Sequence, residues 1–496
     1  MTMFNIRGMR GFLASSIGVT CAAALALPLT PPAVAATARP APGAEAATSA
    51  ALSAGPSARR ESTGQSTAGS TQSLPLVPLT RDRAVDGPAA QGLTRRTVRP
   101  FSLVGVVWDD PDAELHGRVQ VRTRAAGTGT WSGWQEVETH NADHAADLDT
   151  PERASGRVRG ATAPLWVGDS DGVELRVRSE SDDSAADSAG HTSGARNLPA
   201  APPLPSGLRL ELVDPGEDDD AAPGAEEGSR AADALNAENS ALTEYSAVTE
   251  ASAVNADLAP LGATEIAALS RAQTEQEYLA LDAGGLTEQQ RQAKPYIGPR
   301  PGIVTRRGWG ANEGLRESGF RYTKKVKAAF VHHTAGGNNY RCSQAPSVIR
   351  SIYRYHVKSM GWRDIGYNFL IDKCGKIYEG RAGGVAKPVL GAHTLGFNSN
   401  SMGIAVLGSY GAHKPSKSAV KAVARLTAWK LGLYRVNPKG KTTLKSAGSN
   451  LHRKGKKVRL NVISGHRDGF KTECPGRKLY GKLGSARSKA ARYQGR

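Results

Sequence analysis

Hydrophobic and polar residues alternate over several short runs between about residue 97 and residue 214. These runs are rich in β-branched residues, are separated by Gly, Asp and Pro, and read FSLVGVVWDD, GRVQVRTRA, GTWSGWQEVE, GVELRVRSE and GLRLELVDP. Alternation with a period of two is typical of strands that bury one face. The pattern predicts a small antiparallel β-domain over residues 96–215, with a sandwich as its expected form.

Three tryptophans in this predicted β-domain bear on whether it binds carbohydrate. Trp108, Trp131 and Trp134 could stack on sugars, but packing in the core is the expected role of a tryptophan. Wall binding by the β-domain is therefore only one of two interpretations.

A different pattern begins at about residue 296. The predicted strands are KAAFVHH, GYNFLID, KIYEG and MGIAVLGSY, the last of which is apolar enough for a central strand covered on both faces. Between the first two, QAPSVIRSIYRYHVKSM predicts a helix because its apolar positions recur on one face. A second helix is predicted from about Ser416 to Leu431. We expect an α/β fold over residues 296–496, with a mixed central β-sheet flanked by helices.

The remaining segments lack these patterns. Residues 1–35 combine Arg7 and Arg10 with an apolar run and a small-residue cleavage pattern, which predicts a signal peptide and an exported protein, secreted or associated with the cell wall. No later run is long enough for a transmembrane segment, so none is expected in the mature protein. Residues 36–95, rich in Ala, Ser and Pro, predict a disordered tether, and residues 216–295 an acidic linker.

Charge divides the chain unevenly. Residues 296–496 hold 40 Lys and Arg against 7 Asp and Glu, whereas residues 1–295 hold 24 against 39. A strongly basic domain favours an anionic partner, although a basic surface without a specific partner is the simpler alternative. We find no nucleic-acid recognition motif and expect no nucleic acid. Anionic polymers of a cell wall are the expected partners of an exported basic domain.

Three cysteines remain once the predicted signal peptide, with Cys21, is removed: Cys342, Cys374 and Cys474. Export permits disulfides, and an odd number of cysteines leaves at least one unpaired. Pairing Cys342 with Cys374 would join the start of the first predicted helix to a hairpin turn and leave Cys474 over. Cys474 could then be a metal ligand, a nucleophile or a buried thiol.

Two histidines could share a site with Cys474. His332 lies at the end of the predicted strand KAAFVHH, and His466 follows the short apolar run LNVIS. A catalytic zinc site needs three ligands and one open coordination position, and two histidines with one cysteine meet that requirement. A strand-end histidine taken alone is more often a structural hydrogen-bonding group.

Five motifs, in order, resemble the peptidoglycan recognition protein family, also called type 2 N-acetylmuramoyl-L-alanine amidases. They are VHHTAGG, WRDIGYNFLID, GKIYEGRAGG, GAHTLGFNSNSMGIAVLG and VISGHRDGFKTECPG. The resemblance spans about residues 305–483. It implies the family's mixed sheet and zinc-floored groove, with Zn²⁺ held by His332, His466 and Cys474.

The same resemblance implies roles for further residues. Tyr367 and Thr472 match catalytic positions, and His333 matches a structural one. The residues expected to border the groove and bind the substrate are Glu379, Arg381, His393 and Asn398. An ion pair within the fold is an equal alternative for Glu379 and Arg381. Some related amidases carry a Glu on the strand that reads MGIAVLG here, so the general base stays unassigned.

The implied activity is that of a secreted zinc-dependent N-acetylmuramoyl-L-alanine amidase acting on peptidoglycan. A water activated by zinc would attack the lactyl carbonyl, and the amide between N-acetylmuramic acid and L-alanine would break. Two alternatives remain. One is a non-catalytic peptidoglycan-binding protein on the same fold, against which the presence of Cys474 and Tyr367 argues. The other is a thiol hydrolase with Cys474 as nucleophile and His466 as base.

Overall fold

The structure is a computed structural model. It describes residues 69–79, 90–139, 141–179, 202–216, 246–281, 287 and 294–496. The predicted signal peptide and most of the predicted tether lie outside these ranges. The chain divides into one unit of residues 1–63 and another of residues 64–496, and all that follows concerns the second unit. Within the described ranges, no helix is both long enough and apolar enough to cross a bilayer.

The N-terminal part of this unit is an antiparallel β-domain, as the alternating runs predicted. Its strands are β1 (Thr71–Pro75), β2 (Val77–Pro78), β3 (Ala90–Trp108), β4 (Gly117–Ala125), β5 (Gln135–Val137), β6 (Gly160–Ala161), β7 (Leu165–Ser179) and β8 (Arg209–Val213). They form one hydrogen-bonded sheet in the order β1-β8-β3-β7-β4-β5, with β2 and β6 paired to β3. Register shifts between β3 and β7 bend the long strand β3, and the sandwich expected for this domain stays a prediction.

This β-domain begins earlier than the sequence patterns indicated. β1, β2 and the start of β3 fall within residues 36–95, where a tether was expected. The run TQSLP pairs antiparallel with β8, from Thr71 opposite Val213 to Pro75 opposite Arg209. A short segment containing proline has little strand signal of its own, and its distant partner strand makes it a strand.

The predicted acidic linker also contributes structure. Residues 246–253 are helical, β9 (Glu265–Ile266) pairs with the sheet of the C-terminal domain, and α2 (Arg271–Leu281) follows. Ile266 and Tyr278 are buried in the core of the C-terminal domain. These elements are too short for a clear sequence pattern, and tertiary burial stabilises them.

The tryptophans of the β-domain divide between core and surface. Trp108 is buried, as expected of a core residue. Trp131 and Trp134 are partly exposed, and arginine side chains stack on them, with Arg95 over Trp131 and Arg176 over Trp134. These cation–π contacts occupy the faces that a sugar would need.

The C-terminal domain has the predicted mixed α/β fold. Its sheet has the order β17-β11-β14-β12-β13-β10-β9. The strands other than β9 are β10 (Ile303–Val304), β11 (Ala328–His333), β12 (Phe369–Ile371), β13 (Ile377–Glu379), β14 (Ser401–Val406) and β17 (Ile463–Gly465). β14 is buried throughout and lies between β11 and β12, in the central place that its apolar run predicted.

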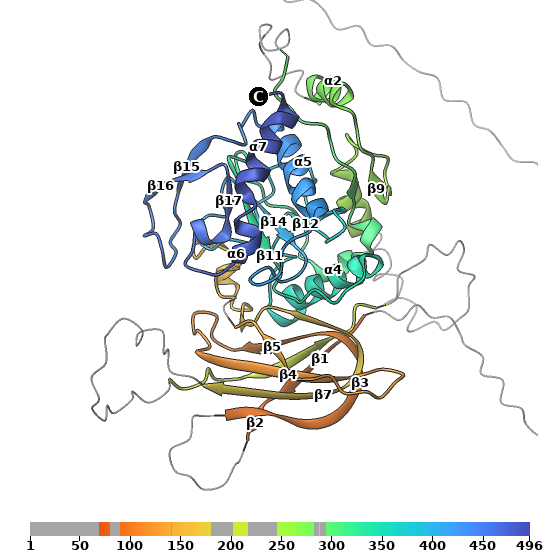
Figure 1. Ribbon diagram of the computed structural model, residues 1–496, viewed down its shortest axis with the longest axis vertical. Helices are drawn as coiled ribbons and strands as arrows, with labels where there is room; N and C mark the ends of the chain where they lie inside the picture. The colour runs from red at the N-terminus through yellow and green to blue at the C-terminus, as the bar shows by residue number, and fades with distance from the viewer. Residues whose placement is uncertain are drawn as a thin grey trace, which may run out of the picture. The chain divides into compact units, whose positions relative to one another are not determined.

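Helices cover both faces of this sheet. α4 (Ala345–Arg354), continued by the π-helical turn η6 (Tyr355–Ser359), packs with one core cluster, and α5 (Lys417–Leu433) and α7 (Leu483–Gln494) pack with the other (Figure 1). Ser416 caps α5 by accepting a hydrogen bond from the Ala419 amide, so the predicted helix start is confirmed. A hairpin of β15 (Lys441–Lys445) and β16 (Lys457–Asn461), the 3-10 turn η7 (His466–Asp468) and α6 (Arg477–Tyr480) complete the domain.

A disulfide joins Cys342 to Cys374, the pairing that cysteine parity favoured. It links the 3-10 turn η5 (Cys342–Gln344), which directly precedes α4, to the turn between β12 and β13, and the two cysteines are 32 positions apart. Within the described residues Cys474 is the free cysteine, and it is buried.

Removing this disulfide should destabilise the protein. Closing a loop of this length lowers the entropy of the unfolded chain, so Cys342→Ser with Cys374→Ser should lower the free energy of unfolding by about 4 kcal/mol. Urea unfolding followed by tryptophan fluorescence measures the loss. A reductant should reproduce it in the wild type and leave the double variant unchanged. Equal stability of oxidised wild type and double variant would contradict the expectation.

Candidate metal centre

Parallel strand pairing brings His332 and His466 together. β11 pairs with β17 in a register that places Val331 opposite Gly465, so the next residues along the two strands are His332 and His466. His332 shares a face of β11 with Phe330, because side chains alternate along a strand. The two Nδ1 atoms lie 3.1 Å apart, and both side chains are fully buried.

Cys474 reaches the same place from the loop that follows η7. The Arg467 amide donates a hydrogen bond of 3.0 Å to the Cys474 carbonyl, which folds this loop back beside His466. The Cys474 Sγ lies 3.7 Å from His332 Nδ1. His333, the neighbour of His332, has a structural contact, since its Nδ1 accepts a hydrogen bond from the Tyr410 amide.

Two distances among these donor atoms match the edges of a tetrahedral zinc site. In a tetrahedral site with zinc–nitrogen and zinc–sulfur bonds of ordinary length, two ligand nitrogens lie about 3.3 Å apart, and a ligand nitrogen and sulfur lie about 3.6 Å apart. These distances are the edges of the ligand tetrahedron. The observed edges of 3.1 Å and 3.7 Å are close to both values. The chemistry of the donor set therefore fits zinc.

A fourth donor comes from the β-domain. His144 lies in the segment between β5 and β6, and its Nε2 is 3.6 Å from Cys474 Sγ. One ligand atom from each of His144, His332, His466 and Cys474 lies within 4.8 Å of all the others. The four residues thus form one cluster, which we call the metal cluster.

Burial sets the protonation states in this cluster. Burial, assisted by neighbouring histidines, lowers the pKa of His332 well below its usual value, and burial lowers the pKa of His466 to about 3. Both imidazoles are therefore neutral and have a lone pair for a metal. Burial, with a contribution from Asp143, raises the pKa of the Cys474 thiol. A buried thiol of raised pKa is a poor nucleophile, and a cation is what would favour its thiolate.

The two residues expected to be catalytic lie beside the cluster. The ring centroid of Tyr367 is 5.6 Å from that of His332, and burial, with the charges of Cys474 and Asp143, raises the pKa of its hydroxyl. This hydroxyl therefore stays protonated and can donate. Thr472 Oγ1 accepts a hydrogen bond of 3.1 Å from the Cys474 amide, which places it next to the ligand loop.

Three of the four expected groove residues surround the cluster or meet the β-domain. His393 is buried, with its ring centroid 5.3 Å from that of His332. Asn398 accepts a hydrogen bond from the His393 amide and donates to the Ala145 carbonyl. Arg381 is buried and donates to both oxygens of the Glu152 carboxylate, at 2.8 and 2.9 Å.

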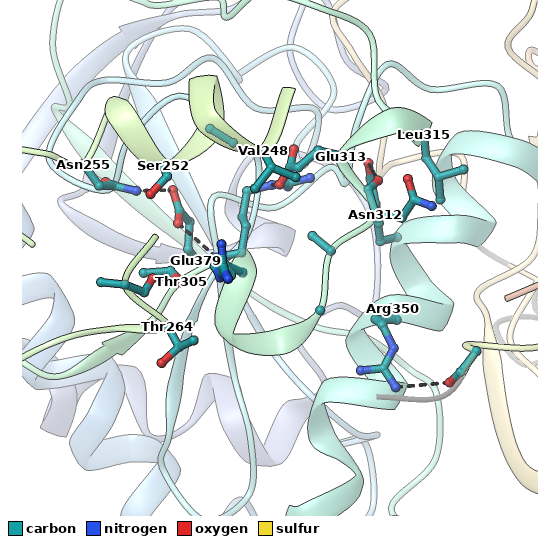
Figure 2. Close-up of a pocket in the computed structure, with 18 of the residues that line it drawn as sticks. Val248, Ser252, Asn255, Thr264, Thr305, Asn312, Glu313, Leu315, Arg350 and Glu379 are labelled. Carbon is teal, nitrogen blue, oxygen red and sulfur yellow. Dashed lines mark hydrogen bonds and ion pairs between the residues drawn. The ribbon is translucent and has the colours of Figure 1, made fainter. Parts of the chain in front are cut away.

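Glu379 lies in a different environment. It accepts hydrogen bonds from the Asn255 side chain and the Arg306 amide, at the edge of a cavity of about 480 Å³ (Figure 2). Burial raises its pKa to about 7, against the lowering effect of these hydrogen bonds. None of the metal-cluster residues lines this cavity. These contacts within the fold favour the structural interpretation of Glu379.

Sequence reasoning missed His144 and its neighbour Asp143. They lie in HNADHAADLD, a polar stretch with neither helical nor strand periodicity. This stretch belongs to the β-domain, which the sequence analysis treated as separate from the site in the C-terminal domain. Asp143 Oδ1 is 3.0 Å from His144 Nδ1, and carboxylate–histidine pairs are a common feature of metal sites. The Asp-His dipeptide was the available signal, but it carries little specificity in a chain with 11 histidines.

Comparison with protein families matches two parts of the chain. Residues 322–477 match a family described as N-acetylmuramoyl-L-alanine amidase. Residues 56–202 match one described as Rv3811 N-terminal galactose-binding domain-like, whose match begins before the predicted boundary at residue 96.

Individual relatives agree with the C-terminal match. The chain is 31% identical to peptidoglycan-recognition protein SC2 of Drosophila simulans over 36% of this chain and 84% of that protein. It is 31% identical to human N-acetylmuramoyl-L-alanine amidase over 42% of this chain and 32% of that protein. Among solved structures, wild-type Drosophila PGRP-LB is 26% identical, with 37% of this chain and 92% of that one covered and a TM-score of 0.29. The chain belongs to the family of peptidoglycan recognition proteins and N-acetylmuramoyl-L-alanine amidases.

Proposed function

We propose that this protein is an exported, zinc-dependent N-acetylmuramoyl-L-alanine amidase that hydrolyses the amide between N-acetylmuramic acid and L-alanine in peptidoglycan. The observation that carries the proposal is the distance of His332 Nδ1 from His466 Nδ1 and from Cys474 Sγ, since both distances suit a tetrahedral metal. The amidase family match and the human relative named as an amidase support the substrate and the bond.

His332, His466 and Cys474 would hold the zinc. When bound, zinc supplies a Lewis acid that activates water for attack on a carbonyl. The chain keeps these ligands oriented through their other contacts. His332 Nε2 lies 3.4 Å from Thr394 Oγ1, which holds the ring so that Nδ1 faces the cluster.

Tyr367 is the proposed hydrogen-bond donor to the oxyanion that develops on the lactyl carbonyl. Its raised pKa keeps the proton on the hydroxyl, and a buried donor is worth more than the same donor in water. Thr472 is the second proposed donor, because its hydroxyl lies beside the cysteine ligand. Hydrolysis consumes one water and leaves a carboxylate on the lactyl group and an amine on L-alanine.

Peptidoglycan is the proposed partner, and the basic surface of the C-terminal domain suits anionic wall polymers as well. Lys441, Lys445, Lys457 and Arg459 are exposed on the β15–β16 hairpin. Their positive charge would favour contact with a phosphate-rich or carboxylate-rich wall.

Zinc removal should abolish activity. The purified protein should contain one equivalent of zinc by elemental analysis, and its release of new L-alanine amino termini from peptidoglycan should stop with a chelator and return with Zn²⁺. Cys474→Ala should lose both the zinc and the activity, because it deletes a ligand. Activity of metal-free protein, blocked by a thiol-alkylating agent, would instead support a thiol hydrolase. If the zinc-loaded protein binds peptidoglycan and no variant cleaves it, the protein is a non-catalytic peptidoglycan-binding protein.

Tyr367→Phe should separate catalysis from metal binding. Removing one preorganised donor to an oxyanion typically lowers kcat by about 10²- to 10³-fold. Zinc content should stay at the wild-type value, since the Tyr367 hydroxyl is not one of the ligand atoms in the metal cluster. An unchanged kcat would remove Tyr367 from the proposed mechanism.

A further inference from the structure

A loop of the β-domain covers the metal cluster. This covering loop, residues 141–155, connects β5 to β6, and its polar side chains Asp143, His144, Asp147 and Glu152 are all buried. Buried polar groups need partners, and those of Asp147 and Glu152 belong to the C-terminal domain.

The covering loop is anchored at the residues that the family resemblance places in the substrate groove. Glu152 forms a two-pronged, buried ion pair with Arg381. Asp147 Oδ1 accepts hydrogen bonds from the Asn398 side chain at 2.8 Å and from the Gly396 amide at 2.7 Å. The Leu395 amide donates to the Asp143 carbonyl. The loop thus uses carboxylates and a backbone carbonyl, the same acceptor groups that a stem peptide would offer.

The docked loop leaves no room for a substrate. The space beside Cys474, lined also by Asn141, His144 and Thr472, measures about 20 Å³. That volume suits about one water molecule, whereas a ligand of modest size needs a pocket of about 300 Å³ or more. The exposed fractions of the cluster side chains are 0% for His332 and His466, 3% for Cys474 and 6% for His144. In this arrangement a muramyl peptide has no route to the metal ligands.

His144 not only covers the other three residues of the metal cluster but is also placed to bind the metal. Its Nδ1 lies 3.0 Å from the Asp143 carboxylate, so a proton on Nδ1 leaves the lone pair on Nε2. Nε2 is 3.6 Å from Cys474 Sγ, which is the nitrogen–sulfur edge of a tetrahedral zinc site. Structural zinc sites have four protein ligands, whereas catalytic sites keep one position open for water.

We infer that His144 is a fourth zinc ligand, supplied by the covering loop, and that it closes the metal centre and holds the amidase in a latent state. The part of the inference that concerns latency rests on the proposed amidase function, whereas zinc binding by His144 does not depend on it. Activation then requires the covering loop to leave, so that water replaces His144 and the stem peptide replaces Asp147 and Glu152.

The rest of the interface would keep the β-domain in place while the loop moves. The Tyr355 hydroxyl donates to the Thr162 carbonyl, and Ser359 donates to Glu211. A Cβ built on Gly105 would lie 2.3 Å from the Tyr355 hydroxyl oxygen, so only glycine permits this close approach. These contacts are independent of the residues that anchor the covering loop.

Two full-length variants test the inference, each with a matched control from the β-domain. His144→Ala removes the ligand and is paired with His116→Ala, a partly exposed histidine of the β-domain. Glu152→Lys reverses the charge that faces Arg381 and is paired with Glu136→Lys, an exposed glutamate. The readouts are zinc affinity by chelator competition, the absorption spectrum of the Co²⁺-substituted protein, alkylation of Cys474 in metal-free protein, and release of L-alanine amino termini.

His144→Ala should lower zinc affinity by at least tenfold, since even loss of an outer contact to a ligand costs about 10- to 100-fold. It should also change the Co²⁺ spectrum and raise the amidase rate. Glu152→Lys should do the same and should speed alkylation of Cys474 at least tenfold, because the loop that buries the thiol is displaced. Both controls should behave as wild type.

Zinc affinity and Co²⁺ spectra of His144→Ala and Glu152→Lys that match wild type would overturn the inference. If His144→Ala does not fold, the rate of Cys474 alkylation in Glu152→Lys still tests the inference. An alkylation rate equal to that of wild type would show that reversing the charge of Glu152 does not displace the covering loop, and would contradict the inference. If zinc affinity and the Co²⁺ spectrum change but no variant shows amidase activity, His144 is still a zinc ligand, and the proposed amidase function is wrong.

Discussion

The parallel pairing of β11 with β17 is the constraint on which the site depends. Because Val331 lies opposite Gly465, His332 and His466 emerge side by side at the ends of their strands, and the sheet holds both with little freedom. Cys474 then needs only a short return loop to complete the donor set. Burial keeps both imidazoles neutral without a metal, so the two histidines are already placed and in the protonation state that binds one.

Electrostatics makes the covering loop and a substrate exclude each other. Arg381 is buried, and a buried guanidinium without an anionic partner is costly, so a carboxylate has to accompany it. In this structure that partner is Glu152. An anionic stem peptide could take its place with little net loss, which would allow exchange between a closed and an open site without unfolding of either domain.

Periodicity predicted the parts of the fold whose burial follows a repeating pattern. The strands that lead to His332 and Tyr367, the central strand β14, and the capped helix α5 were all evident from apolar spacing. The short strands β1 and β9 were not, because two to five residues carry no period and gain their conformation from a partner strand. Glu379 was expected at the groove, but hydrogen bonds from Asn255 and Arg306 hold it elsewhere, and Asn255 lies in a segment interpreted as linker.

The sequence by itself determined which side chains could make up a metal-binding donor set. An unpaired Cys474, two strand-end histidines and the motifs around them already indicated a zinc amidase, since residue type and local strand geometry decide which atoms can bind a metal. Only the tertiary structure decided that the centre is closed. His144 is 188 positions before His332 in the chain and lies in another domain, in a loop without periodicity. Its place beside Cys474 follows from the packing of the two domains, which no local pattern encodes.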